Sequence, residues 1–157
     1  MSGIIESIKT YPAKGDAGVE LAQARLIEDQ GLEGDFHARG GDRQISLLFA
    51  ETGDEMTKLK ERAFCLSRFK ENISIRSLAH DASAPGMEAK AGPVTAPGVR
   101  LTVGEAILEI TGETKHCHEE CSLYKAGKRC PLAGLNLFAR VLKGGIIRTG
   151  DKVEFAQ

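Results

Sequence analysis

Short runs of branched and apolar residues, separated by glycines, recur along the whole chain and constrain its fold more than any other feature. They occupy Ile4–Ile8, Val19–Ile27, Gln44–Phe49, Asn72–Ile75, Arg100–Val103, Ala106–Thr111, Phe138–Leu142 and Lys152–Phe155. Each run has the length and composition of a β-strand, and residues 106–111 alternate apolar and polar side chains as in a half-buried sheet. Gly144-Gly145 and Gly150-Asp151 predict turns between short strands near the end of the chain.

Helical patterns are few by comparison. One amphipathic helix is expected to begin near Glu51, with Met56, Leu59 and Ala63 at spacings of three and four residues. A second is expected from residue 118 to about residue 125. With so little helix, 18 glycines and 157 residues, the chain is expected to form one domain over residues 1–157. Its predicted fold class is mainly β, a barrel-like domain with a few short helices.

Charge and composition narrow the setting. The chain has 21 basic and 22 acidic side chains, a net charge of -1 and 41% hydrophobic residues, as in an ordinary soluble globular protein. This balance favours neither nucleic acid nor an anionic membrane as a partner. The amino terminus lacks the basic flank and apolar run of a signal peptide, and no segment is apolar enough to span a bilayer, so we expect a cytoplasmic location.

Three of the four cysteines and two of the four histidines lie within fifteen residues. This cluster and the lysine before it comprise Lys115, His116, Cys117, His118, Cys121 and Cys130. The cationic neighbours of Cys117 favour its thiolate, which is both a nucleophile and a soft-metal ligand. Two other interpretations remain open. The three thiols with one histidine could form a tetrahedral Cys3His zinc site, or the thiols could be inert and packed.

A second candidate site is the loop Gly31–Gln44, which is rich in glycines, carboxylates and cations. Glycines expose backbone amides and Arg43 can hold a phosphate through two hydrogen bonds, so one interpretation is a pocket for a phosphorylated ligand. The other is a polar turn in which Asp35 or Asp42 caps backbone amides and Arg43 makes a structural salt bridge. Asn72 could fix the polar edge of a ligand or simply make a turn at a strand entrance.

Six short motifs follow one another along nearly the whole chain. They are Gly31–His37, Asp42–Leu48, Glu71–Ile73, Leu101–Ala106, Lys115–His118, and Phe138–Gly145 with Gly150–Asp151. In this order and spacing they make the chain resemble the MOSC domain, the module named for the C-terminal part of molybdenum cofactor sulfurase. The short stand-alone type is the most similar, because a Cys-x-x-Tyr pattern, here Cys121–Tyr124, follows the key cysteine.

The resemblance implies a β-barrel-rich fold that binds a molybdenum cofactor of the molybdopterin type. Cys117 occupies the position of the family's motif cysteine, which carries sulfur, for example as a persulfide, or ligates molybdenum. Larger relatives deliver sulfur to the cofactor or reduce N-hydroxylated compounds. This chain would need a sulfur-donating desulfurase or an electron-transfer protein as its partner.

The residues and the resemblance together give one hypothesis for the site. The amides of the Gly31–Gly41 loop, with Arg43, would receive the pterin's phosphate, and His37 of the same loop is also expected to bind the cofactor. The polar edges of the pterin would be oriented by Asp35 and Asn72. The sulfur of Cys117 would be kept anionic by Lys115 and the neighbouring histidines, His116 and His118. The alternatives are a non-catalytic cofactor carrier and a zinc-stabilised binding module.

Overall fold

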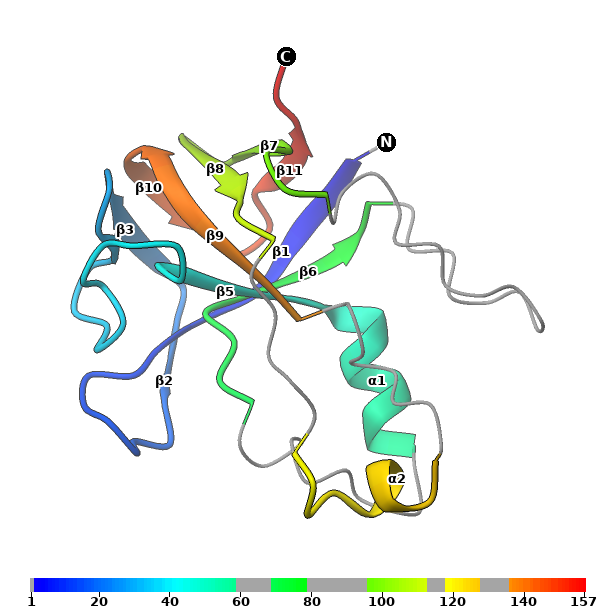
Figure 1. Ribbon diagram of the computed structural model, residues 1–157. Helices are drawn as coiled ribbons and strands as arrows, with labels where there is room; N and C mark the ends of the chain where they lie inside the picture. Colours follow the sequence, from blue (N-terminus) through cyan, green and yellow to red (C-terminus); the bar gives the residue numbers. More distant parts are fainter. Residues whose placement is uncertain (1, 59–68, 79–95, 113–117, 128–135) are drawn as a thin grey trace.

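The computed structural model describes residues 2–58, 69–78, 96–112, 118–127 and 136–157. Over these residues the chain is mainly β, with two short helices, and seven of its strands close into a barrel (Figure 1). The expected fold class is therefore confirmed. Neither helix of the described part is long and apolar enough to cross a bilayer.

The element bounds follow the glycine-separated runs of the sequence. The strands are β1 (Ser2–Thr10), β2 (Val19–Leu21), β3 (Gln23–Ile27), β4 (Gly31–Leu32), β5 (Ile45–Phe49), β6 (Ile73–Ser77), β7 (Arg100–Val103), β8 (Ala106–Ile110), β9 (Asn136–Lys143), β10 (Gly145–Arg148) and β11 (Lys152–Phe155), and the helices are α1 (Ala50–Lys58) and α2 (Ser122–Lys125).

The barrel runs in the order β11-β7-β8-β9-β5-β6-β1, and the pairing of β1 with β11 closes it. Neighbouring strands are antiparallel except β5 and β6, which are parallel. A parallel pair needs a crossover, and α1 forms part of it between the two strands. At the far end of β1, β2 adds an eighth strand, and a second sheet has the order β10-β3-β4.

Alternation along the strands separates the packed interior of the barrel from its outer face. On β5, Ile45, Leu47 and Phe49 are buried in the hydrophobic core, whereas Ser46 and Leu48 belong to the opposite face. The neighbouring strands contribute inward side chains in the same way. Polar residues of the barrel strands are therefore available on the outer face, and the candidate site lies there.

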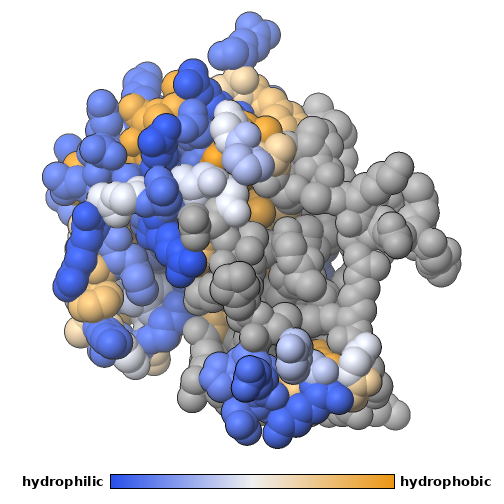
Figure 2. All heavy atoms as spheres, viewed as in Figure 1, coloured by the Kyte–Doolittle hydropathy of each residue, from blue (hydrophilic) through white to orange (hydrophobic). Residues whose placement is uncertain are grey.

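Most of the described surface in the view of Figure 2 is hydrophilic, with apolar residues in small separate patches. Large apolar side chains that are exposed among the described residues are Ile4, Val19 and Tyr124, and they belong to β1, β2 and α2. Because they are spread over different elements, they give no single apolar docking surface.

The predicted strands are confirmed, except that one of them is two separate strands and that two further strands were not predicted. The run predicted over Val19–Ile27 is divided at Ala22 into β2 and β3, which lie in different sheets. The strands β4 and β10 were not predicted. Helix α1 begins one residue before the predicted start, and α2 covers part of the predicted second helix. Leu59 and Ala63 of the first helical pattern lie outside the described residues.

Candidate functional site

A cavity of about 570 Å³ lies against the outer face of the barrel. Strands β5 and β9 contribute to its wall, together with the chain after β1, the loop before β5 and the chain before β6. Its lining comprises Tyr11, Ala13, Lys14, Gly15, His37, Arg43, Ser46, Lys70, Asn72 and Phe138. Four of these side chains are basic, and none of the described lining residues is a carboxylate. The positive lining favours an anionic ligand.

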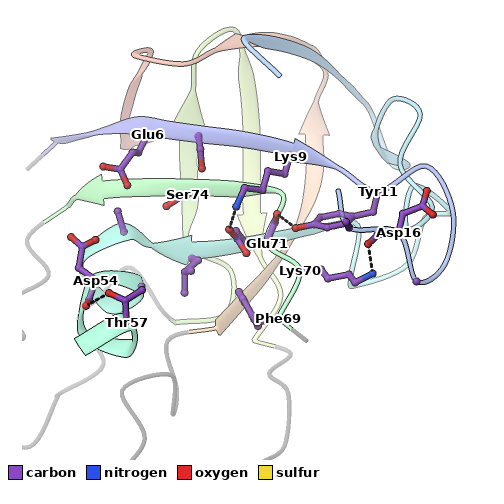
Figure 3. Close-up of a pocket in the computed structure, with 16 residues that line it drawn as sticks. Glu6, Lys9, Tyr11, Asp16, Asp54, Thr57, Phe69, Lys70, Glu71 and Ser74 are labelled. Atoms are coloured by element: carbon purple, nitrogen blue, oxygen red, sulfur yellow. Dashed lines mark hydrogen bonds and ion pairs between the residues drawn. The ribbon is translucent and has the colours of Figure 1, made fainter. Parts of the chain in front are cut away.

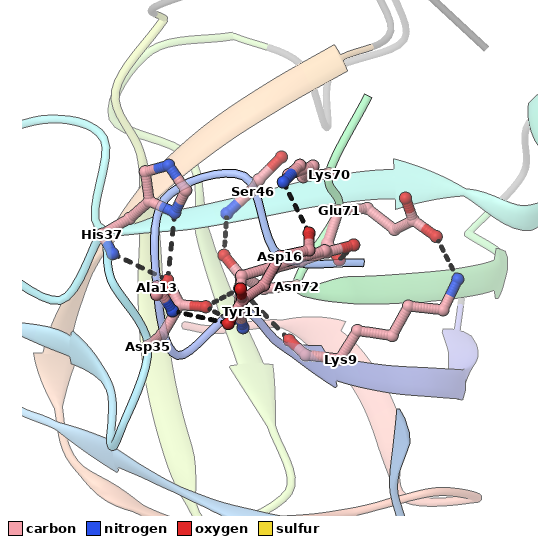
Figure 4. Close-up of polar contacts among 10 residues, drawn as sticks. All are labelled: Lys9, Tyr11, Ala13, Asp16, Asp35, His37, Ser46, Lys70, Glu71 and Asn72. Atoms are coloured by element: carbon pink, nitrogen blue, oxygen red, sulfur yellow. Dashed lines mark hydrogen bonds and ion pairs between the residues drawn. The ribbon is translucent and has the colours of Figure 1, made fainter. Parts of the chain in front are cut away.

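Asp35 holds the loop against the barrel (Figure 4). Its side chain is fully buried, and its Oδ1 accepts hydrogen bonds from the backbone amide of Tyr11 at 2.8 Å and from Nδ2 of Asn72 at 3.1 Å. Its Oδ2 accepts one from the backbone amide of His37 at 2.9 Å. Asp35 therefore caps backbone amides, as the polar-turn interpretation predicted, and does not itself line the cavity.

Asn72 joins three barrel segments and also lines the cavity. Its Nδ2 donates to the carbonyl of Lys9 at 3.2 Å, and its Oδ1 accepts from the backbone amide of Ser46 at 3.0 Å. Its own backbone amide donates to the carbonyl of Ser46 at 2.9 Å. Only 2% of Asn72 is exposed, so its amide group is a fixed part of the cavity floor.

His37 stands at the cavity with one ring nitrogen already engaged. Its side chain is 49% exposed, and Nδ1 lies 3.2 Å from Oδ2 of the buried Asp35. The ring also packs edge-on against Phe36, with centroids 5.4 Å apart. The carboxylate favours the tautomer that carries its proton on Nδ1, which leaves Nε2 as an acceptor for a ligand.

Arg43 reaches the cavity from the end of the loop. Its guanidinium carbon lies 5.1 Å from the centre of the Phe138 ring on β9, within the range of a cation–π contact. The next residue, Gln44, anchors the end of the loop, because its buried Oε1 accepts from the amide of Val141 at 2.9 Å and its Nε2 donates to the carbonyl of Gly41 at 2.9 Å. The guanidinium is thus held beside an aromatic wall.

Most backbone amides of the loop are used within the protein. The amides of residues 33, 35, 36, 38, 39 and 40 donate to backbone carbonyls at 2.8–3.3 Å, and the amide of His37 donates to Asp35. The expectation that loop amides receive a phosphate therefore has no support in the structure for these residues. Side chains, not loop amides, make the basic lining of the cavity.

Tyr11 and Lys70 separate this cavity from a second one of about 550 Å³ between α1 and the outer faces of β1 and β6 (Figure 3). The Tyr11 hydroxyl donates to the carbonyl of Glu71 at 3.1 Å, and Lys70 Nζ lies 5.2 Å from the ring centre. Burial, with the charges of Glu71 and Asp35, raises the pKa of Tyr11 to about 12. The Tyr11 side chain therefore lines the cavity as a neutral hydrogen-bond donor at physiological pH.

Of the remaining predicted site residues, only His118 is described, and it is not among the described lining residues of the cavity. His118 is exposed near α2, and its Nδ1 accepts from the amide of Glu120 at 3.1 Å. Lys115 and Cys117 lie outside the described residues, so their roles stay predictions. Cys121 is buried at the start of α2.

The zinc interpretation also stays a prediction, because most of its ligands belong to segments that the structure does not describe. Within the described residues, no three His, Cys, Asp or Glu side chains are grouped so that they could hold a metal ion.

Sequence reasoning missed several lining residues, among them Tyr11, Ser46, Lys70 and Phe138. For one of them, Ser46, the sequence does contain an indication of its position. Ser46 is a polar residue inside an otherwise apolar strand, at a position whose neighbours on both sides face the core. Such a residue faces away from the core and marks the outer face of β5.

Several solved structures have a fold similar to that of this chain. The YuaD protein from Bacillus subtilis is 18% identical, with a TM-score of 0.66 over 98% of this chain and 94% of that one. YiiM from Escherichia coli is 17% identical, with a TM-score of 0.59 over 100% of this chain and 70% of that one. YiiM from Geobacillus stearothermophilus is 18% identical, with a TM-score of 0.59 over 99% and 75%.

These likenesses show a shared fold. At 17–18% identity the likeness extends to the fold alone. No protein-family model matches the sequence, and no curated protein is significantly similar to it.

Proposed function

We propose that this protein binds a molybdopterin-type cofactor in the cavity between Tyr11 and Phe138. We further propose that it acts with a partner in cofactor sulfuration or delivery, or in the reduction of N-hydroxylated compounds. The observation that carries the proposal is the basic, partly aromatic lining of this cavity in a chain whose motifs resemble the MOSC domain. Its volume, about 570 Å³, is within the range of sites for organic ligands and cofactors.

The chemistry of the lining fits such a ligand. Arg43, Lys14 and Lys70 would bind and neutralise its phosphate, and the rings of Tyr11 and Phe138 would bound its flat part. The cofactor would supply a redox-active metal when bound. The protein's own contribution would be to bind the ligand, to orient it and to limit the access of water.

The residues behind the wall would act by positioning. Asp35 orients His37 through its Oδ2, and Asn72 fixes the backbone of Ser46. We propose that Asp35 acts on the ligand only through these neighbours, because its side chain is fully buried. His37 would hydrogen-bond the ligand through Nε2, the nitrogen that Asp35 does not engage.

Chain length supports a role for Cys117 at this cavity. Thr111, the residue after β8, donates from its amide to the carbonyl of Phe138 at 3.0 Å and from its hydroxyl to the carbonyl of Asp42 at 2.8 Å. Both acceptors are in segments that form the cavity wall. Cys117 follows six residues later, so at most about 20 Å of extended chain separates it from Thr111. We propose that its thiolate or persulfide reaches the ligand.

Cofactor binding by variants tests the proposal. Arg43→Gln should weaken the binding of molybdopterin with or without metal, because it removes a charged partner of the phosphate. Cys117→Ser should weaken retention of the metal-bearing form alone. Arg39→Gln is the matched control, because Arg39 lies over Phe36 at 4.2 Å and does not line the cavity. Pterin fluorescence titration and elemental analysis give the two readouts.

The outcomes separate the parts of the proposal. Binding by Arg43→Gln equal to that of the unchanged protein contradicts the cavity as the cofactor site. Unchanged metal retention in Cys117→Ser removes the sulfur role. A holoprotein that keeps its cofactor but turns over no N-hydroxylated compound with an electron donor, and transfers no sulfur, is a carrier.

A further inference from the structure

The side-chain hydroxyl of Ser46 is a buried polar group that the protein itself leaves unpartnered. The residue is 6% exposed and lines the cavity, yet its Oγ has no hydrogen-bond partner among the described residues. Leaving a buried hydroxyl unsatisfied destabilises a fold, so such a group calls for an explanation. A ligand in the cavity would provide the missing partner.

The backbone of Ser46 is fully engaged, which leaves only this hydroxyl. Its amide donates to Oδ1 of Asn72 at 3.0 Å, and its carbonyl accepts from the amide of Asn72 at 2.9 Å. Figure 4 shows the Ser46 side chain pointing away from these contacts. Asn72 therefore fixes the backbone from which the hydroxyl projects on the outer face of β5, which favours a preorganised site for a ligand.

The Arg43 guanidinium and this hydroxyl both neighbour Phe138. Ser46 on β5 pairs directly with Phe138 on β9, and directly paired side chains stand about 5 Å apart. Arg43 lies over the ring of that same Phe138, 5.1 Å from its centre. A neutral hydroxyl donor and a guanidinium thus border the same part of the cavity, and Lys14 and Lys70 add positive charge to its wall.

We propose that Ser46 and Arg43 form an oxyanion subsite that takes a phosphate monoester. Arg43 would bind two phosphate oxygens and the Ser46 hydroxyl would donate to a third. A phosphate monoester is nearly a dianion at neutral pH and has three strong acceptor oxygens, which suits this combination of donors and charge. The subsite lies in the same cavity as the proposed cofactor site. Its assignment to the cofactor's own phosphate rests on the proposed function.

Phenyl phosphate is the probe that tests the subsite without a pterin, and phenol is its unphosphorylated counterpart. We expect calorimetry to show binding of phenyl phosphate that Ser46→Ala weakens about tenfold or more, since hydrogen bonds to charged groups have effects of this size. Arg43→Gln should weaken it as well. The difference between phenyl phosphate and phenol should shrink in both variants.

Thr10→Val is the matched control. The Thr10 hydroxyl is also buried and without a partner among the described residues, but Thr10 does not line the cavity. This variant should bind phenyl phosphate as the unchanged protein does. Without ligand, Ser46→Ala should unfold at no lower temperature than the unchanged protein, because it removes an unsatisfied hydroxyl. A loss of binding in this variant is then not a loss of fold.

Several results overturn the subsite: no binding of phenyl phosphate, equal binding by Ser46→Ala, or equal losses in Ser46→Ala and Thr10→Val. Molybdopterin titrations distinguish its failure from that of the proposed function. Molybdopterin binding that Ser46→Ala leaves unchanged rejects the subsite and keeps the function. Phenyl phosphate binding that depends on Ser46, without any binding of molybdopterin, keeps the subsite for another phosphate monoester and rejects the function.

Discussion

At the scale of single residues, the geometry of the cavity depends on Asp35. Its carboxylate accepts from two backbone amides, from the Asn72 side chain and from the ring of His37. These contacts join the end of β1, the loop and the start of β6, which are far apart in the sequence. One buried carboxylate thereby sets the relative positions of several cavity residues.

Asp35→Ala should lower the free energy of unfolding by about 3 to 5 kcal/mol, because it leaves several buried donors without an acceptor. Urea denaturation measures the change. Asp16→Ala is the control, because Asp16 accepts from the amide of Ala13 at 2.9 Å on the exposed surface, and its loss should cost less than about 1 kcal/mol. Equal losses in the two variants would contradict the bridging role of Asp35.

The sequence alone could single out some cavity residues and not others. His37, Arg43 and Asn72 stand in motifs rich in functional groups, and the structure places all three at one cavity. Tyr11 and Lys70 carry no local signal of this kind. They join the cavity only because β1 pairs with β6, and pairings between distant segments are not encoded in local composition.

At the scale of elements, alternation predicted the strands well where they are long enough to show it. It failed for β4, which has only two residues, and for β10, whose first residue Gly145 was interpreted with Gly144 as a turn. The break between β2 and β3 at Ala22 was also missed, because no change of composition marks it. Residues 19–27 have a strand-like composition throughout, although the chain passes within them from β2 at the edge of the barrel sheet to β3 in the second sheet.

Gly31 in the short strand β4 lies too close to the backbone of Gln44 to carry a side chain. Its φ is +141°, and a Cβ added there would lie 2.8 Å from the carbonyl oxygen of Gln44 and 3.1 Å from Cα of Ala38. Gly31→Ala should therefore lower the free energy of unfolding by about 2 to 3 kcal/mol, through backbone strain and a steric clash together. The displaced Gln44 backbone would also disturb the adjoining Arg43.

Gly34→Ala is the matched control for this change. Gly34 has a φ of +82°, but a Cβ there meets no atom within 4 Å, so only strain of about 1 kcal/mol is expected. Urea denaturation of both variants gives the comparison. If Gly34→Ala were as damaging as Gly31→Ala, close approach to Gln44 would not be the reason for glycine at position 31.

At the scale of the whole molecule, the described fold is held together by a closed barrel around an apolar core. The pairing of β1 with β11 closes the barrel, and residues such as Ile8, Leu108 and Val153 are completely buried inside it. Burial of apolar surface is the main source of folding free energy. The described part therefore has a source of stability that does not depend on a metal ion.

Chelation tests this conclusion against the zinc-module interpretation of the cysteine cluster. We expect a chelator to change the thermal unfolding midpoint of the purified protein by no more than about 1 °C, because the apolar barrel core does not require metal. Protein treated with chelator and then with excess zinc is the control. A fall of about 10 °C or more that zinc reverses would mean that a structural metal site contributes to folding. In that case, elemental analysis should find one zinc per chain before chelation, and Cys121 would be a ligand rather than a buried side chain beside α2.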